Sequence, residues 1–248
     1  MNKWRHIHRK IFHRKGYGIH SPFVFDLITN VVEQRLPFYA YKDIDLIRLH
    51  LRLHNQSIIY KEKQYSIKKY LQKQAITKKE GELLFRLSNH YKLHSIVSVG
   101  SSMGFTPLYL TGYSSKSQCI TLEQEQDIAA IAQKSISKSS CSLIQIMQGA
   151  YQSLLPEALS KLQQIDCIYI SKEITTEELM KIYQDILPFL HDKSIVIISG
   201  IHASSQKRNL WKQICKDPKI TVSVDLYKLG LIFFRPKLHK RMYKSRML

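Results

Sequence analysis

Short apolar runs alternate with amphipathic helical segments from Thr77 onward, and this alternation constrains the fold more than any other feature. The runs include SIVSV, QCITL, DCIYI and SIVIIS, which have the length and β-branched content of buried strands. Helix starts are marked by two capping boxes, Thr77 with Glu80 and Thr175 with Glu178. The last two runs, in ITVSVDLYKLGLIFF, are too close for a crossover helix and must pair antiparallel. We therefore predict an α/β, Rossmann-like fold: a seven-stranded, mostly parallel sheet with its last strand antiparallel and helices on both faces.

The segment before this alternation is expected to be helical and basic. Ser21-Pro22 places a capping residue before a proline, which predicts a helix start. Apolar spacing predicts helices over residues 22–36 and 43–53, whereas residues 54–74 are polar and basic and are interpreted as a linker or cap. The predicted organisation is a basic N-terminal helical extension or cap, 1–75, followed by a Rossmann-like domain, 76–248.

The charge is strongly positive and uneven, with a formal net charge of +19. No acidic residue precedes Asp26 and none follows Asp225, while the first fifteen residues and the segment RPKLHKRMYKSRML each carry six Lys or Arg. Such clusters attract polyanions, so nucleic acid or an anionic membrane surface is a possible partner, but a solvated basic surface explains them equally well. The four cysteines are scattered, which favours reduced thiols, and no apolar run reaches the roughly 18 residues of a membrane span. No secretory signal is recognisable, and we expect a cytoplasmic protein.

Two glycines follow the first strand of the alternation, in the stretch VGSSMGFTPLYL. Gly100 and Gly104 either permit an ordinary tight turn or shape a loop around a cofactor. The spacing does not fit the three-glycine fingerprint of dinucleotide sites, and no Gly-Lys-Ser/Thr follows as in a phosphate-binding loop. Glu123 ends the next strand, about twenty residues on, where an acidic side chain can accept hydrogen bonds from ribose hydroxyls. Glu123 also lies at a helix start, where negative charge is stabilised in any case.

These motifs resemble those of class I S-adenosylmethionine-dependent methyltransferases, and most closely a group of bacterial O-methyltransferase-like proteins with a catechol-type plan. The resemblance covers nearly the whole chain, from GYGIHSPFVFDLI through VGSSMGFTPLYL and TLEQEQDIAAIAQ to ITVSVDLYKLGLIFFR. It implies S-adenosylmethionine as the cofactor. It also implies the cofactor-binding residues: Gly100, Ser101 and Gly104 for the methionine part, Glu123 for the ribose, Gly149, Ala150 and Tyr151 near the adenine, and Ser171 at the end of the fourth strand.

The chain departs from the family pattern at two strand ends. Similar proteins carry Asp-Gly after the fourth strand and Asp-Asp after the fifth, where this chain has Ser171-Lys172 and Ser199-Gly200. Carboxylates at these positions hold a divalent cation in metal-dependent relatives, so we expect no metal site here. His202, just beyond the fifth strand, is the candidate general base, although a structural histidine explains it as well.

The leading expectation is a metal-independent, O-methyltransferase-like enzyme. The alternatives are an inactive methyltransferase-fold protein that binds nucleic acid or an anionic membrane through its basic surface, and an RNA-directed methyltransferase supported by charge alone.

Overall fold

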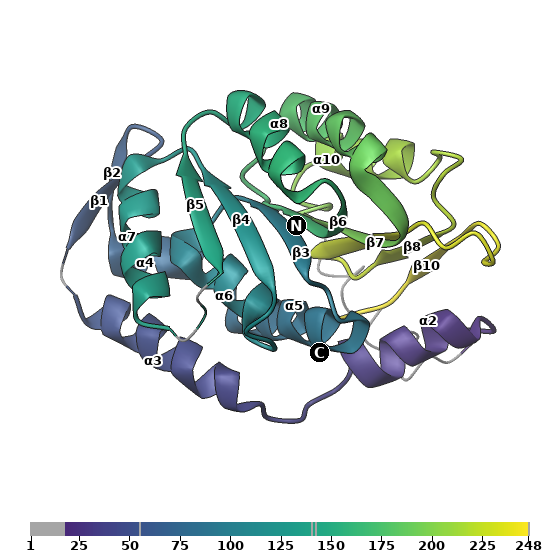
Figure 1. The fold of residues 1–248 in the computed structure, drawn as a ribbon, viewed down its shortest axis with the longest axis horizontal. Helices are drawn as coiled ribbons and strands as arrows, with labels where there is room; N and C mark the ends of the chain where they lie inside the picture. Colours follow the sequence, from purple (N-terminus) through teal and green to yellow (C-terminus); the bar gives the residue numbers. More distant parts are fainter. Residues whose placement is uncertain (1–17, 55, 140, 142, 248) are drawn as a thin grey trace. The chain divides into compact units, whose positions relative to one another are not determined.

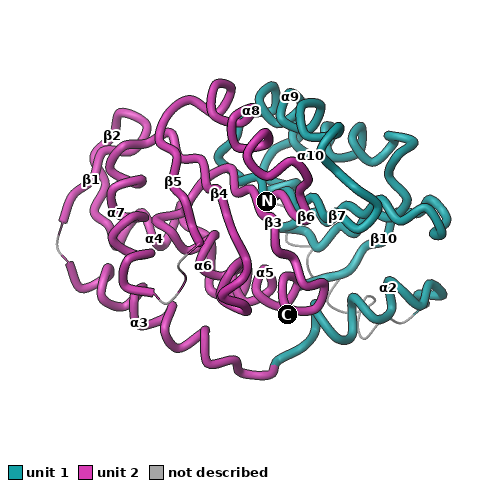
Figure 2. Tube along the Cα trace, viewed as in Figure 1, with its two compact units in different colours: residues 1–35, 169–248 teal, residues 36–168 magenta. Residues whose placement is uncertain are grey.

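The computed structural model describes residues 18–54, 56–139, 141 and 143–247. These residues pack as two compact units (Figure 2). Unit 1 includes the described residues of 1–35 together with 169–248, and unit 2 comprises 36–168. The boundary between them falls within strand β6 (Ile165–Ile170). The domain boundary predicted at residue 75 stays a prediction.

Unit 2 contains a parallel three-stranded arrangement with β4 in the middle (Figure 1). Its strands are β3 (Ser95–Val99), β4 (Gln118–Glu123) and β5 (Ile144–Gln148). The helices of this part are α5 (Lys78–Tyr91), α6 (Phe105–Thr111), α7 (Gln126–Ser137) and α8 (Tyr151–Leu162), with the short η2 (Ser102–Gly104) before α6. Strands and helices alternate as predicted, because each helix buries the apolar stripe that the sequence shows; Leu83, Leu84 and Leu87 of α5, for example, are fully buried.

Unit 1 contains the antiparallel part of the fold. Its strands are β7 (Leu190–Ser199), β8 (Val222–Asp225), β9 (Leu229–Phe233) and β10 (Arg241–Lys244), and its helices include α9 (Thr176–Ile186), η3 (Leu187–Phe189) and α10 (Ser205–Ile214). Strand β9 pairs antiparallel with both β7 and β8, so the prediction for the last two apolar runs is confirmed. Strand β10, which pairs parallel with β8, was not predicted.

The helix predicted at Ser21-Pro22 is present in unit 1, with the Ser21 hydroxyl accepting a hydrogen bond from Val24 N at 3.4 Å. It runs as α2 (Pro22–Asp26) and continues as the π-helical η1 (Leu27–Val32), so it ends four residues before the predicted limit of residue 36. The ring of Phe23 packs edge-on against Phe233 at 5.0 Å. Both predicted capping boxes are confirmed, at the starts of α5 and α9.

The interpretation of residues 54–74 as a linker is wrong. After α3 (Tyr39–Leu53) this stretch forms an antiparallel pair, β1 (Ser57–Tyr60) and β2 (Lys63–Ser66), and then α4 (Ile67–Lys73). Two acids at the start of α7 hold the pair: Asp127 Oδ2 accepts from Ile59 N at 2.6 Å, and Glu125 Oε2 accepts from Lys61 N at 3.2 Å. In the described part of the chain, no helix is both long and apolar enough to cross a membrane.

Candidate functional site

The loop after β3 is built on left-handed backbone conformations. Gly100, Ser102, Met103 and Gly104 have φ values of 96°, 54°, 59° and 90°. The carbonyl of Ser101 closes the loop by accepting hydrogen bonds from Gly104 N at 2.9 Å and Thr106 N at 3.3 Å. A Cβ added at Gly104 would lie 3.1 Å from the carbonyl oxygen of Ala132 in α7. Glycine is therefore required at 104 both for its φ and for the close approach of the loop to α7.

Glu123, the last residue of β4, is bonded directly to this loop. Its Oε2 accepts hydrogen bonds from Ser101 N at 2.9 Å and from Ser101 Oγ at 2.5 Å, and its Oε1 accepts one from Glu125 N at 3.2 Å. The residue is only 4% exposed. Burial raises the pKa of Glu123, and the hydrogen bonds from Ser101 and from the backbone act against this shift. An ionised carboxylate offers about four acceptor positions, so Oε1 keeps capacity for a ligand hydroxyl.

Backbone hydrogen bonds align the neighbouring loops with the end of β4. Gly100 N donates to Leu122 O, and Gly149 N donates to Glu123 O, each at 2.9 Å. Unit 2 thus brings Gly100, Ser101, Gly104, Glu123 and Gly149 together at the carboxyl edge of its strands, which is where ligands of open α/β sheets bind. Ala150 and the buried Tyr151 begin α8 beside them. Their individual roles in holding a cofactor stay predictions.

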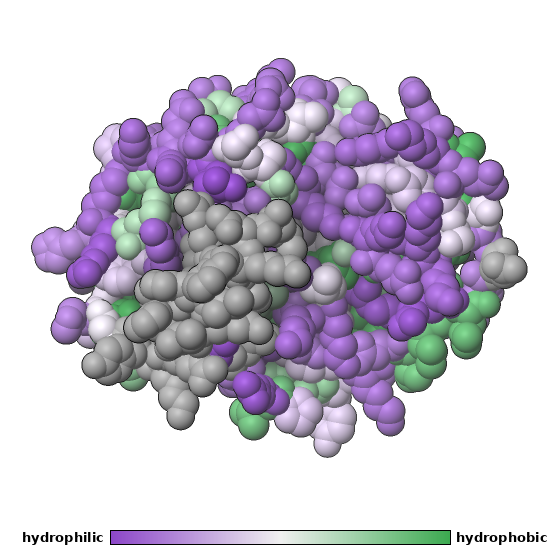
Figure 3. All heavy atoms as spheres, turned by 180° about the vertical axis from the view of Figure 1, so that it is seen from behind, coloured by the Kyte–Doolittle hydropathy of each residue, from purple (hydrophilic) through white to green (hydrophobic). Residues whose placement is uncertain are grey.

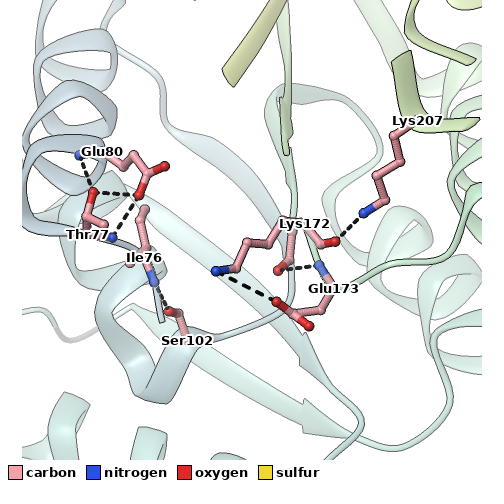
Figure 4. A network of polar contacts seen from close by, with 8 residues as sticks. Ile76, Thr77, Glu80, Ser102, Lys172, Glu173 and Lys207 are labelled. Carbon is pink, nitrogen blue, oxygen red and sulfur yellow. Dashed lines mark hydrogen bonds and ion pairs between the residues drawn. The ribbon is translucent and has the colours of Figure 1, made fainter. Parts of the chain in front are cut away.

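The loop is also tied to the segment before α5. The Ser102 hydroxyl accepts a hydrogen bond from Ile76 N at 2.7 Å, and the next residue, Thr77, forms the capping box with Glu80 (Figure 4). The capping box fixes the direction in which the chain enters α5, and the bond from Ile76 holds the loop against that entry point. The sequence predicts the capping box but not the hydrogen bond from Ile76 to Ser102. These two residues are 26 positions apart, and no local pattern connects them.

A second polar group lies in unit 1, after β6 and β7 (Figure 4). The Lys207 ammonium donates to the carbonyl oxygen of Lys172, and the Lys172 ammonium lies 3.9 Å from Glu173 Oε1. The Ser171 hydroxyl accepts a hydrogen bond from Glu173 N at 3.3 Å. A Cβ added at Gly200 would lie 2.7 Å from the Lys172 Cβ, so the chain after β7 is in close contact with the chain after β6.

Where a metal site needs several carboxylates, these strand ends carry Ser171, Lys172 and Ser199, and Glu173 contributes a single carboxylate beside Lys172. Mg²⁺ is usually held by one or two carboxylates plus waters and substrate oxygens, and an ammonium nearby disfavours a bound cation further. Within the described residues, no three or more His, Cys, Asp or Glu side chains are grouped so that they could hold a metal ion. Metal independence and a cofactor contact of Ser171 both stay predictions.

His202 lies in unit 1 between a carboxylate and an aromatic ring. Its Nε2 is 2.8 Å from Asp225 Oδ2, and its ring stacks on Tyr227 with centroids 5.1 Å apart and planes 11° from parallel. Asp225 Oδ1 accepts a hydrogen bond from Tyr227 N at 2.8 Å. The sequence pointed to His202 but not to Asp225. The available signal was a single acid at the end of the apolar run VSVD, the last acid in the chain.

Comparison with known proteins identifies the fold. No protein-family model matches the sequence, and no curated protein matches it significantly. Among solved structures, the O-methyltransferase TomG from Streptomyces achromogenes, in complex with SAM, superposes with a TM-score of 0.58 at 13% identity, covering 81% of this chain and 91% of TomG. An O-methyltransferase from Bacillus cereus in complex with SAH gives 0.56 at 13% identity, over 85% and 97% of the two chains. The SAH-bound methyltransferase PaMTH1 from Podospora anserina gives 0.54 at 12%, over 82% and 99%. The chain therefore has the Rossmann-like α/β fold of these methyltransferases.

Proposed function

We propose that this protein is an S-adenosylmethionine-dependent methyltransferase of the O-methyltransferase type that works without a divalent metal. The observation that carries the proposal is the buried carboxylate of Glu123 at the end of β4, hydrogen-bonded to the glycine loop that follows β3. The same fold holds S-adenosylmethionine or S-adenosylhomocysteine in solved methyltransferases, which supports a nucleoside-type cofactor at this edge.

The residues present fit this cofactor. The Oε1 atom of Glu123 would accept a hydrogen bond from a ribose hydroxyl, the backbone of the loop from Gly100 to Gly104 would face the methionine part, and Gly149 and Ala150 would border the adenine. When bound, S-adenosylmethionine supplies an electrophilic methyl group on a sulfonium. The protein then has to align the accepting oxygen with that methyl group and exclude water, and these tasks need no metal.

The lysines in unit 1 would favour an acceptor with a negatively charged oxygen, although Glu173 offsets part of the charge of Lys172. Lys172 and Lys207 stand beside the strand ends where metal-dependent relatives are expected to carry acids. An ammonium stabilises a developing oxyanion by the same electrostatic attraction that a divalent cation provides, although with half the charge.

The test compares two variants that each remove one carboxylate from the same loop region. Glu123→Ala should weaken S-adenosylhomocysteine binding, measured by calorimetry, by about 1.5–3 kcal/mol, the scale of a lost hydrogen bond to a charged group. Glu125→Gln is the matched control, because its side chain accepts from Lys61 N rather than from the glycine loop. Equal affinities of wild type and Glu123→Ala would show that the ribose assignment is wrong.

A further inference from the structure

Exposed apolar side chains are concentrated in one part of unit 2. Of the nine large hydrophobic residues that are exposed among the described residues, six lie between residues 36 and 59. Four of them belong to α3 and β1: Leu46, Leu49, Leu53 and Ile59, with exposed fractions of 55%, 51%, 76% and 62%. Figure 3 shows hydrophobic side chains gathered over α3, at the lower right of that view. Clusters of exposed apolar side chains mark interaction sites more often than scattered single ones do.

Helix α3 cannot bury these leucines by turning about its axis, because its opposite side is anchored. The residues that α3 buries are Tyr41, Ile44 and Ile47. On the anchored side, the Arg48 guanidinium lies 4.0 Å from the centroid of the Phe105 ring in α6, and Asp45 is paired with Lys78 of α5. The three leucines recur at intervals of three and four residues, so they share the outer side of the helix. The structure therefore presents them on a fixed element.

The same part of unit 2 is rich in exposed cations. Residues 39–73 contain eight Lys or Arg and three acids, and one of these acids is the Asp45 that Lys78 already pairs. The exposed cations from the end of α3 to the end of α4 are Arg52, Lys61, Lys63, Lys68, Lys69 and Lys73. These elements are packed together, because β1 pairs with β2 and α4 contacts both β2 and α3. We call the exposed side chains of α3, β1, β2 and α4 the α3–α4 face.

We propose that the α3–α4 face docks on an anionic lipid bilayer. The leucines of α3 and Ile59 enter the boundary between headgroups and acyl chains, where their aliphatic carbons leave water. The lysines and Arg52 contact the lipid phosphates and carboxylates, and the negative surface potential of the bilayer attracts them. This inference is independent of the proposed methyltransferase function.

Other partners fit this combination less well. Two copies that met through the α3–α4 face would bring together two surfaces of the same net positive charge, which repel. Lysine is also depleted at interfaces between proteins. The phosphates of an RNA would engage the cations, but RNA recognition relies on polar contacts and aromatic stacking and leaves the exposed leucines without a role. An anionic bilayer uses both kinds of side chain.

Flotation of the full chain with lipid vesicles tests the apolar part of the face. Wild type should bind vesicles of equal parts phosphatidylcholine and phosphatidylserine, and should not bind vesicles of phosphatidylcholine alone. Leu49→Gln with Leu53→Gln should weaken binding to the mixed vesicles about tenfold or more, because the aliphatic carbons that enter the bilayer are lost. The matched control is Leu143→Gln with Met242→Gln, which changes two exposed apolar side chains outside the face and should bind as wild type. Equal binding by wild type and the Leu49, Leu53 variant would overturn the proposal.

The same assay tests the charged part of the face. Arg52→Gln, Lys63→Gln and Lys68→Gln together should weaken binding to the mixed vesicles about tenfold or more, since each lost cation removes an attraction to the bilayer surface. The control neutralises three exposed lysines of unit 1: Lys181, Lys193 and Lys212. It removes the same net charge and should weaken binding less. Equal losses in the two triple variants would contradict docking through the α3–α4 face.

Two further measurements separate the bilayer from the other partners. Sedimentation without lipid should give the same mass for wild type and for the variant that carries Leu49→Gln and Leu53→Gln. A larger assembly formed by wild type alone would show that the leucines hold a second copy, and would overturn the proposal. Single-stranded RNA should bind this variant and wild type equally. RNA binding that depends on the leucines would likewise overturn the choice of a bilayer.

Discussion

Glu123 and Ser101 are the residues on which the proposed cofactor site depends most. The Ser101 backbone and hydroxyl both donate to one oxygen of Glu123, so the glycine loop and the end of β4 are joined by a buried carboxylate. The sequence predicted Glu123 from its distance to the loop. It did not predict the bond from the Ser101 hydroxyl, because a serine in a glycine loop carries no local sign of its partner.

The raised pKa of Glu123 predicts a pH dependence of stability. Its folded-state pKa lies above the unfolded value, so the stability it contributes is fully present below the ordinary carboxyl range and is lost as pH rises through the folded pKa. A glutamine at position 123 cannot ionise. The free energy of unfolding of Glu123→Gln should therefore rise relative to that of wild type as the pH increases from about 4.5. Urea unfolding at several pH values measures this difference. A difference that stays constant with pH would show that folding does not raise the pKa of Glu123 and would contradict this prediction.

At the scale of elements, helix starts and apolar strands were predictable and the short polar strands were not. The capping boxes of α5 and α9 and the buried runs of β3, β4 and β7 carry local signals, and the structure follows them. Strands β2 and β10 are largely exposed and polar, so they show no apolar alternation. Strand β2 pairs with the adjacent β1, and acids of the distant α7 bond Ile59 in β1 and Lys61 in the turn. Strand β10 pairs with β8, which is separated from it in sequence by β9.

The contact between the glycine loop and α7 can be tested with a matched pair of glycine variants. Gly104→Ala introduces a Cβ at positive φ and 3.1 Å from Ala132 O, whereas Gly18→Ala introduces one at φ +76° with nothing within 4 Å. Both carry a backbone penalty of roughly 1–2 kcal/mol. Gly104→Ala should cost about 1 kcal/mol more in the free energy of unfolding and should also weaken S-adenosylhomocysteine binding. Equal costs for the two variants would show that the loop does not pack tightly on α7.

At the scale of the whole molecule, charge is the most distinctive property. Hydrophilic residues dominate the described part of the face shown in Figure 3. The exposed cations near the end of the chain include Lys237, Lys240, Arg241 and Lys244. Removal of residues 237–248 would also remove β10, so charge must be tested by substitution rather than by truncation.

We predict that Lys237→Gln, Arg241→Gln and Lys244→Gln together weaken binding to single-stranded RNA or anionic vesicles. Lys240 is left intact because its ammonium bonds the Lys216 and Asp217 carbonyls. For RNA, each lost phosphate contact should reduce the slope of log K against log salt by about 0.7. A control that neutralises Lys79, Lys134 and Lys181, which are exposed elsewhere, should change binding less. If the two triple variants weaken binding equally, the loss of net charge alone explains the weaker binding. That result would contradict a specific basic surface near the end of the chain.

The central claim is a methyltransferase cofactor site that works without metal, and titration of the wild-type chain with S-adenosylhomocysteine tests it most directly. Calorimetry with Mg²⁺ and again with EDTA should give one site per chain and the same dissociation constant in both conditions, because the strand ends of unit 1 offer Ser171, Ser199 and Gly200 instead of acids. No detectable binding, or binding that requires Mg²⁺, would contradict the account.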